Sequence, residues 1–421
     1  MTITALYQLF LENNTICTDT RKITKCCLFF ALKGDNFNGN EFAEDAIKLG
    51  ASFAIIDQKH YKIDHRYILV DDVLKTLQAL STLHRTTLGI PIIALTGSNG
   101  KTTTKELMNS VLSKKFKITA TIGNLNNHIG VPLTLLSMTA TTEIGIIEMG
   151  ANHQQEIKFL TDLALPDYGL ITNFGKAHLE GFGGIEGVIK GKSEMYSHLK
   201  AHDKIIFVNS GDELQLRQVG DYKRVEKFGS KMLLTASQPY VELTYKNYTI
   251  KTQLTGAYNF NNICVAIAIG AYFKVPNIDM IEALEHYVPT NNRSQIIEKN
   301  GVRIILDAYN ANPTSMLAAL SSLDQMKNDR KIAVLGDMFE LGDEARAEHQ
   351  TIADRLHELA IEQKILIGEH FFSSEKKHET ITYFKTFEDF KTNFDSQQFQ
   401  NHLLLIKGSR GMALERLLNL I

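Results

Sequence analysis

Apolar and polar positions along the chain follow two alternating patterns. Short apolar runs of about four to eight residues, typical of buried strands, are separated by longer segments with apolar positions at helical spacing. In the middle of the chain, residues 92–95, 144–148 and 169–172 predict strands, and residues 103–112 predict a helix. Strands that alternate with helices pair in parallel and form sheets covered on both faces. The pattern therefore predicts an α/β fold.

The last part of the chain shows the same alternation. Strands are predicted at residues 302–307, 331–336, 365–367 and 403–406, with helices at 313–326, 343–359 and 412–420. This order is typical of a Rossmann-like, doubly wound sheet, whose ligands bind at the carboxyl ends of the strands.

Shorter elements fill the first part of the chain. They are predicted strands at 27–32, 52–57 and 67–70, helices at 41–49 and 73–86, and a polar loop at 33–40. In the middle part, residues 241–250 predict a hairpin at the sheet edge, and residues 259–273 an apolar helix. With about 150 residues per domain, we predict three domains. They are a small α/β domain at 1–87, a central domain with a P-loop-type, mostly parallel sheet at 88–298, and the Rossmann-like domain at 299–421.

Composition and charge exclude several classes of protein. The 421 residues carry 45 Lys and Arg against 47 Asp and Glu, with no block of like charge, so no nucleic-acid-binding surface is indicated. The longest apolar stretch, residues 263–273, is far shorter than the roughly 20 residues that span a bilayer. The four cysteines show no paired spacing, which favours a reducing compartment. We expect a cytoplasmic monomer with no membrane insertion and no nucleic-acid partner.

A glycine loop between the predicted strand 92–95 and the helix 103–112 is the clearest chemical signal. It consists of Thr96, Gly97, Ser98, Asn99, Gly100, Lys101, Thr102 and Thr103. In such a loop, backbone N–H groups and a helix N-terminus face an anion, the lysine adds a positive charge, and the first threonine can ligate magnesium. We therefore expect these residues to bind the phosphates of ATP. The alternative is a glycine turn with an exposed lysine.

The loop has Leu95 where the common phosphate loop has its first glycine, and this altered form resembles that of the Mur ligases and folylpolyglutamate synthases. Further motifs narrow the resemblance to the later Mur ligases. They are Thr-Asp-Thr-Arg-Lys at 18–22, Leu-Phe-Phe-Ala-Leu-Lys-Gly at 28–34, Gly-Asn-Leu-Asn-Asn at 123–127, Asp-Ala-Tyr-Asn-Ala-Asn-Pro at 307–313, Gly-Asp-Met-Phe-Glu-Leu-Gly at 336–342 and Lys-Gly-Ser-Arg at 407–410. The chain departs from the family at Ala308, usually serine, and at His128, where an acidic residue is common.

The resemblance implies an ATP-dependent, amide-forming ligase of peptidoglycan synthesis, and thus of cell-wall biogenesis, cell shape and cell division. Its substrates would be a UDP-N-acetylmuramoyl-tripeptide and D-alanyl-D-alanine. ATP would phosphorylate the terminal carboxylate of the tripeptide, and the amine of the dipeptide would displace phosphate from the acyl phosphate. Because the carboxylate and the γ-phosphate repel each other, magnesium, Lys101 and oriented amides must offset the repulsion.

A metal shell is also implied by the resemblance. Glu148 ends a predicted strand, His178 matches a metal-ligand histidine, and Lys192 matches a lysine that carbamoylation turns into an anionic ligand. Together with Thr102, these three residues would hold magnesium, and we expect two ions. Together with Lys101 and Arg293, the same three residues form the predicted catalytic set. The alternatives are a capping carboxylate for Glu148, a surface position for His178 and a solvated helix position for Lys192.

The remaining candidates are assigned by their places in the motifs. For ATP they are Asn259, Asn262, Arg293 and Asp307, although Asn259 could instead cap its helix and Arg293 could be solvated. For the UDP-sugar they are Thr20, Arg21, Lys33, Gly34, Asn36 and Asn40, although Arg21 and Lys33 could be ordinary surface charges. For the rest of the substrate site they are Asn124, Asn127, Tyr309, Asn310 and Asp337, with Asn312 open between substrate contact and helix cap.

Two other functions are considered alongside this one. The first is the preceding Mur ligase, which adds the third amino acid of the peptide. Its third domain should carry an Asp-Asn-Pro-Arg type motif, and this chain has Asn-Ala-Asn-Pro at 310–313 instead. The second is a non-catalytic ATP-binding homologue, which the joint presence of Lys101, Glu148, His178 and Lys192 argues against.

Overall fold

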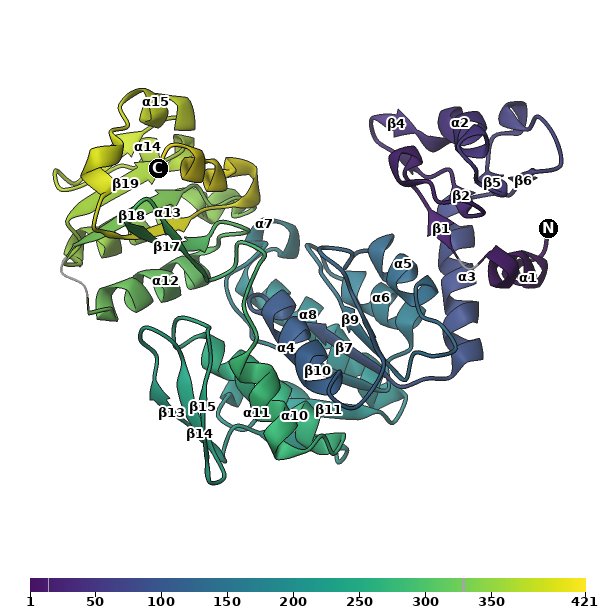
Figure 1. Cartoon of the computed structure of the whole chain (residues 1–421), viewed down its shortest axis with the longest axis horizontal. Coiled ribbons are helices and arrows are strands. Elements are labelled where there is room, and N and C mark those ends of the chain that lie inside the picture. Colours follow the sequence, from purple (N-terminus) through teal and green to yellow (C-terminus); the bar gives the residue numbers. More distant parts are fainter. Residues whose placement is uncertain (14, 328–329) are drawn as a thin grey trace.

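Three α/β domains follow one another in the computed structural model, which describes residues 1–13, 15–327 and 330–421. The N-terminal and C-terminal domains lie at opposite ends of the molecule, and the central domain joins them (Figure 1). The predicted fold class is confirmed. Among the described residues, no helix combines the length and the apolar character needed to cross a bilayer.

The N-terminal domain has a four-stranded parallel sheet in the order β1 (Ile16–Cys17), β2 (Leu28–Phe30), β5 (Phe53–Ile56) and β6 (Tyr67–Leu69). Its helices are α1 (Ile3–Asn13), α2 (Ala43–Lys48) and α3 (Val73–Leu88). The predicted loop at 33–40 is instead a short hairpin of β3 (Lys33–Gly34) and β4 (Phe37–Asn38), followed by a 3-10 turn at Gly39–Phe42. The polar composition did not reveal this antiparallel pairing, which depends on backbone hydrogen bonds rather than on an apolar face.

A six-stranded parallel sheet forms the centre of the molecule. Its order is β12 (Val225–Phe228), β11 (Ile205–Asn209), β10 (Tyr168–Ile171), β7 (Ile92–Thr96), β9 (Ile144–Glu148) and β8 (Ile118–Ala120). The helices are α4 (Lys101–Leu112), α5 (Gly130–Leu136), α6 (Glu156–Ala164), α7 (Leu179–Phe182), α8 (Ile185–Ala201), α9 (Glu213–Val219), α10 (Asn259–Tyr272) and α11 (Asn277–Glu285).

Side chains of β7 divide between two hydrophobic cores because successive strand residues point to opposite faces. Ile92 and Ala94 belong to the core that contains residues of α5, α6 and α8, whereas Ile93 and Leu95 belong to the core with residues of α4, α10 and α11. Both faces of the sheet are therefore covered, and the polar loops at its carboxyl edge are left for ligands.

The predicted hairpin forms, with strands β14 (Glu242–Tyr245) and β15 (Tyr248–Lys251), but it does not extend the parallel sheet. It joins β13 (Met232–Ala236) in a separate antiparallel sheet of three strands. The reason is that its alternate apolar residues, Leu243 and Tyr245 among them, pack into the core of α10 and α11.

The C-terminal domain has a six-stranded sheet in the order β16 (Gln295–Lys299), β17 (Val302–Asp307), β21 (Leu403–Lys407), β18 (Lys331–Gly336), β19 (Gln363–Ile367) and β20 (Thr382–Phe384). Only the pairing of β16 with β17 is antiparallel among these described strands. The helices are α12 (Pro313–Gln325), α13 (Ala345–Glu358), α14 (Glu369–Phe372) and α15 (Phe387–Thr392). The helix predicted at 412–420 is wrong: two 3-10 turns, Arg410–Met412 and Leu414–Asn419, meet at Ala413, whose left-handed φ of 48° interrupts any α-helix.

Candidate active site

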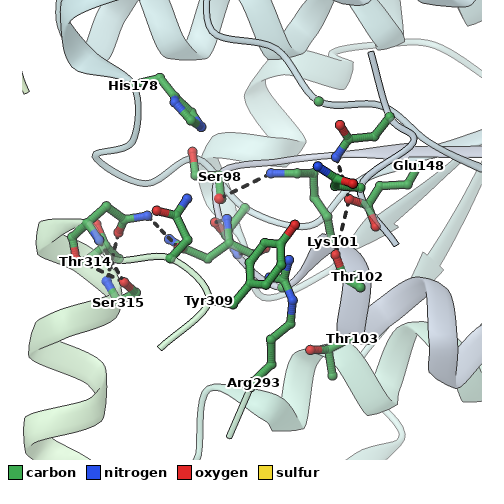
Figure 2. Close-up of a pocket in the computed structure, with 18 of the residues that line it drawn as sticks. Ser98, Lys101, Thr102, Thr103, Glu148, His178, Arg293, Tyr309, Thr314 and Ser315 are labelled. Atoms are coloured by element: carbon green, nitrogen blue, oxygen red, sulfur yellow. Dashed lines mark hydrogen bonds between the residues drawn. The ribbon is translucent and has the colours of Figure 1, made fainter. Parts of the chain in front are cut away.

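A cavity of about 530 Å³ lies between the central and C-terminal domains, and both line it. The central domain contributes the phosphate loop, the end of β9 and the start of α10, and the C-terminal domain contributes the segment after β17 (Figure 2). The carboxyl ends of β9, β17 and β21 reach the cavity through Glu148, Asp307 and Lys407. This is the edge at which parallel α/β sheets bind their ligands.

Both glycines of the phosphate loop are required by its shape. Gly97 and Gly100 have φ angles of 143° and 77°, where side chains other than hydrogen are strained. A Cβ atom at Gly97 would lie 2.0 Å from Thr172 Oγ1, and one at Gly100 would lie 2.5 Å from Asn262 Oδ1. The loop is thus closely packed against the end of β10 and against α10.

Asn173 anchors the phosphate loop. Its backbone oxygen accepts from the Ser98 N–H at 3.1 Å, and its Oδ1 accepts from the Asn99 N–H at 3.0 Å. Asn173 was not among the predicted site residues, although its position directly after a predicted strand is where loop-forming polar residues occur in parallel sheets.

Lys101 turns back onto its own loop (Figure 2). Its Nζ donates to the Gly97 oxygen at 2.7 Å. Burial lowers the pKa of the Lys101 ammonium, and the nearby Glu148 carboxylate opposes that shift. The side chain lines the cavity, so a bound phosphate can replace the Gly97 carbonyl as the partner of Nζ.

Glu148 has one carboxylate oxygen free to bind a cation. Its Oε1 accepts from Thr102 Oγ1 at 3.2 Å and from Asn126 Nδ2 at 2.8 Å, while Oε2 is buried with no hydrogen-bond partner among the described residues. Because its partners are side chains, the alternative that Glu148 caps a turn is wrong. A buried, donor-free carboxylate oxygen beside a threonine hydroxyl fits a magnesium ion.

Lys192 lies on α8 and is fully buried, with 0% of its surface exposed. Its Nζ donates to the Ala151 oxygen at 3.1 Å and lies 5.0 Å from the centroid of the Phe182 ring. Burial lowers the pKa of Lys192 well below its usual range, and the charge of Lys101 lowers it further. The alternative of a solvated helix lysine is therefore wrong.

His178 lines the cavity, but its ring contacts the C-terminal domain. Its Nδ1 pairs with the Glu340 carboxylate, and Lys176 pairs with Glu348 in the same contact. In the described part of the chain, no three His, Cys, Asp or Glu side chains are grouped to hold a metal ion. The predicted ligands Thr102 and Glu148 are thus adjacent, whereas His178 has another partner in this arrangement.

The predicted ATP residues of the linker and third domain come together. The Arg293 guanidinium carbon lies 3.8 Å from the centroid of the Tyr309 ring, and both residues line the cavity (Figure 2). Asp307 also lines it and pairs with Lys407 at 2.6 Å. Arg293 is therefore not simply a solvated charge.

Asn259 and Asn262 face the cavity from the first turn of α10. Asn262 Nδ2 donates to Asn259 Oδ1 at 2.9 Å, and Asn259 Nδ2 donates to the Thr255 oxygen at 2.8 Å. The capping position belongs to Tyr258, which makes no side-chain cap, so Asn259 is not the helix cap.

The asparagines after the phosphate loop and after β17 all reach the cavity, which is lined by Asn124, Asn127, Asn310 and Asn312. Asn312 is the N-cap of α12, since its Oδ1 accepts from the Ser315 N–H at 2.9 Å. Its Nδ2 donates to Asn99 Oδ1 at 2.7 Å, so it also links the C-terminal domain to the phosphate loop.

Asp337 does not line the cavity, contrary to the prediction that it contacts substrate. Its side chain is buried, and its two oxygens accept from the backbone N–H groups of His370 and Phe371 at 2.9 and 3.0 Å. The carboxylate therefore stabilises the start of α14, which follows β19, the strand that pairs in parallel with β18.

None of the predicted UDP-sugar residues lines the cavity; Thr20, Arg21, Lys33, Gly34, Asn36 and Asn40 lie in the N-terminal domain. Arg21 pairs with Asp19 at 2.8 Å and Lys33 with Asp57 at 2.9 Å. Asn40 is fully buried, and its Nδ2 donates to Asp57 Oδ1 at 2.9 Å. Asn40 therefore holds the loop in place, whereas Lys33 is half exposed beside it.

Models of the Mur ligase family match most of the chain. The Mur ligase family catalytic domain matches residues 13–85, the middle domain residues 95–270, and the glutamate ligase domain residues 292–410. With the phosphate loop, Glu148 and Arg293 gathered at one cavity, the chain belongs to the Mur ligase family.

Individual relatives are named more specifically. The chain is 34% identical over 427 residues to a UDP-N-acetylmuramoyl-tripeptide–D-alanyl-D-alanine ligase of Bacillus subtilis (strain 168), covering 96% of this chain and 92% of the relative. It is 33% identical over 419 residues to the ligase of the same name from Escherichia coli (strain K12), with 96% and 92% covered.

The chain is also similar to solved structures of MurF ligases. A crystal structure of MurF from Acinetobacter baumannii has a TM-score of 0.85 at 30% identity and covers 98% of this chain and 97% of its own. MurF ligase from Thermotoga maritima in complex with ADP has a TM-score of 0.82 at 26% identity, with 97% of each chain covered.

Proposed function

We propose that this chain joins D-alanyl-D-alanine to the terminal carboxylate of a UDP-N-acetylmuramoyl-tripeptide and forms the pentapeptide precursor of peptidoglycan. ATP is cleaved to ADP and phosphate through an acyl-phosphate intermediate. The observation that carries the proposal is the cavity between two domains, in which a phosphate loop and a cation-binding carboxylate face Arg293 and Asn310. The names of relatives that match over nearly the whole chain support the choice of substrates.

The ATP phosphates are assigned to residues 96–103 and Arg293, and the nucleoside to Asn259, Asn262 and Asp307. On binding, Lys101 exchanges the Gly97 carbonyl for a phosphate oxygen. Positioned cations lower the repulsion between the γ-phosphate and the incoming carboxylate. We assign Tyr309, Asn310, Asn124 and Asn127 to the acyl group or the dipeptide, because all four line the cavity.

Magnesium fits beside Glu148 and Thr102, where it would neutralise charge on the transferring phosphoryl group. We assign a second ion to Glu148, His178 and the carbamoylated form of Lys192. The support for carbamoylation is that burial lowers the pKa of Lys192, because only an unprotonated amine adds to carbon dioxide. ¹³C NMR after exposure to labelled bicarbonate tests it: a carbamate signal present in the wild-type protein and absent from Lys192→Gln is expected, and its absence from both contradicts the assignment.

Substrate capture is divided among domains with bounds at 1–87, 88–298 and 299–421. The first holds the UDP-sugar through Thr20, Arg21, Lys33, Gly34 and Asn36, with Asn40 shaping the loop. We also assign the chain to the cytoplasm, since all four cysteines are free, as in reducing compartments. We propose separately that it acts as a monomer.

The decisive experiment is a product mass measurement with ATP, magnesium, D-alanyl-D-alanine and UDP-tripeptides that end in lysine or in diaminopimelate. A pentapeptide from one of them is expected, with none from Lys101→Ala. Addition of a single amino acid to a UDP-dipeptide would favour the preceding ligase instead. Phosphate release that is indifferent to the dipeptide would favour a non-catalytic ATP-binding homologue.

A further inference from the structure

The Lys-Gly-Ser-Arg motif at 407–410 contains a buried cation with no role in the reaction described so far. Lys407 is the last residue of β21, and only 2% of its surface is exposed. It lies beside the last residue of β17, because the parallel register pairs Asp307 with Lys407. Both side chains reach the carboxyl edge of the sheet and line the cavity.

Lys407 holds both ends of the segment that carries Tyr309. Its Nζ lies 2.6 Å from Asp307 Oδ2 and 3.3 Å from the backbone oxygen of Asn310. The same motif also holds the segment that follows β18, since Ser409 Oγ accepts from the Phe339 N–H at 3.0 Å and the Ser409 N–H donates to the Asp337 oxygen at 3.1 Å.

The other oxygen of Asp307 extends this connection to the linker. Asp307 Oδ1 accepts from the backbone N–H of Ser294 at 3.2 Å. Asn292 and Ser294 have left-handed φ angles of 56° and 50°, so Arg293 is flanked by conformations that need outside support. The Asp307 carboxylate supplies part of that support and is itself fixed by the Lys407 ammonium.

We propose that Lys407 is a positioning residue for the nucleotide half of the site: it holds Asp307 and, through Asp307 and Ser294, the linker that carries Arg293. This inference rests on the proposed assignment of Asp307 and Arg293 to ATP. Loss of the ammonium leaves the Asp307 carboxylate without its cation, so the carboxylate turns toward water and releases the linker.

Lys407→Met tests the proposal, with ADP affinity measured by calorimetry in the absence of the other substrates. We expect binding at least tenfold weaker, and in the full reaction a matching rise in KM for ATP. Lys407→Arg should restore most of the affinity because it keeps the cation. Unchanged ADP affinity would overturn the proposal, and so would a rise confined to the dipeptide KM.

Two further variants separate positioning from general damage. Lys331→Met removes a buried lysine at the opposite end of the neighbouring strand, where Nζ donates to the Asp324 oxygen at 2.8 Å, and it should leave ADP affinity unchanged. The double variant Lys407→Met, Asp307→Asn should bind ADP no more weakly than Asp307→Asn alone, since Lys407 acts through Asp307. Additive losses would contradict that route.

The ADP-binding and product measurements also test this inference separately from the proposed function. ADP binding needs no dipeptide and no UDP-tripeptide, so failure to form a pentapeptide overturns the substrate assignment alone. Wild-type protein that does not bind ADP overturns both. Circular dichroism shows whether Lys407→Met folds. If it does not, ADP affinity is compared among wild type, Lys407→Arg and the double variant instead. Weaker ADP binding by Lys407→Arg than by the double variant would refute the proposal.

Discussion

Replacing Lys192 by methionine should remove ligase activity and at the same time stabilise the fold. The two side chains are similar in length, and the site is fully buried. Burial of an ammonium costs several kcal/mol. Its hydrogen bond to the Ala151 oxygen offsets about 1.5–3 kcal/mol, and its contact with the Phe182 ring about 2 kcal/mol. The remaining penalty, about 1–3 kcal/mol in the free energy of unfolding, disappears in Lys192→Met.

The sign of the pH dependence follows from the lowered pKa. Lys192 has a folded-state pKa well below the 10.5 of an ordinary lysine. Between these two values the unfolded chain holds a proton that the folded protein does not, so wild-type stability rises with pH across that window. The variant cannot titrate at this position. Its stability advantage should therefore be largest at the low-pH end of the window and shrink as the pH approaches about 10.

Urea denaturation in bicarbonate-free buffer, from about pH 6.5 to about pH 9.5, measures this difference. Lys190→Met is the matched control, since Lys190 is an exposed residue of the same helix, and its stability change should stay within about 0.5 kcal/mol. A Lys192→Met protein less stable than wild type, or an advantage that grows with pH, would refute the reasoning from burial.

Substitutions at three other positions check separate parts of the structure. Glu148→Gln should lower kcat roughly 100-fold or more in a phosphate-release assay, because the oxygen assigned to magnesium loses its charge; activity restored by high magnesium alone would contradict a role in catalysis. Asp337→Asn should destabilise the C-terminal domain by about 1 kcal/mol in thermal unfolding, because it weakens the hydrogen bonds to the start of α14. A large rise in KM for the dipeptide would instead support the substrate role expected from the sequence. Asn312→Asp keeps the helix-cap acceptor but loses the donor to Asn99, so KM for ATP should rise without loss of thermal stability. Asn312→Ala loses both contacts, so it should lower the affinity for ATP and also lower the stability by about 1 kcal/mol.

The strands and the phosphate loop could be predicted because their signals are local. An apolar run specifies β7 or β9 whatever it packs against, and Gly97 and Gly100 mark a loop that only glycine can form. Glu148 was also accessible, since a carboxylate at the end of a buried strand must lie at the carboxyl edge of the sheet.

What the sequence did not reveal depends on contacts between distant residues. Lys407 and Asp307 are 100 positions apart and meet only because β21 inserts between β17 and β18. The burial of Lys192 depends on Phe182 and on packing of α8, in which the lysine follows an exposed Lys190 and gives no local sign of its environment. Asp337 belongs to a recognisable motif, but the position of α14 directs its carboxylate away from the cavity.

The contact between the central and C-terminal domains includes two ion pairs, Lys176 with Glu348 and His178 with Glu340. Partly exposed ion pairs of this kind stabilise a contact by at most about 1 kcal/mol each. At physiological ionic strength, salt also screens interactions between exposed charges, with a screening length of about 8 Å. Under the proposed function, parting and re-forming of such a junction would give a bulky sugar-linked peptide a way in and its longer product a way out. Ionic strength should then change turnover through the rate of domain opening, even where it leaves the chemistry within the cavity unaltered.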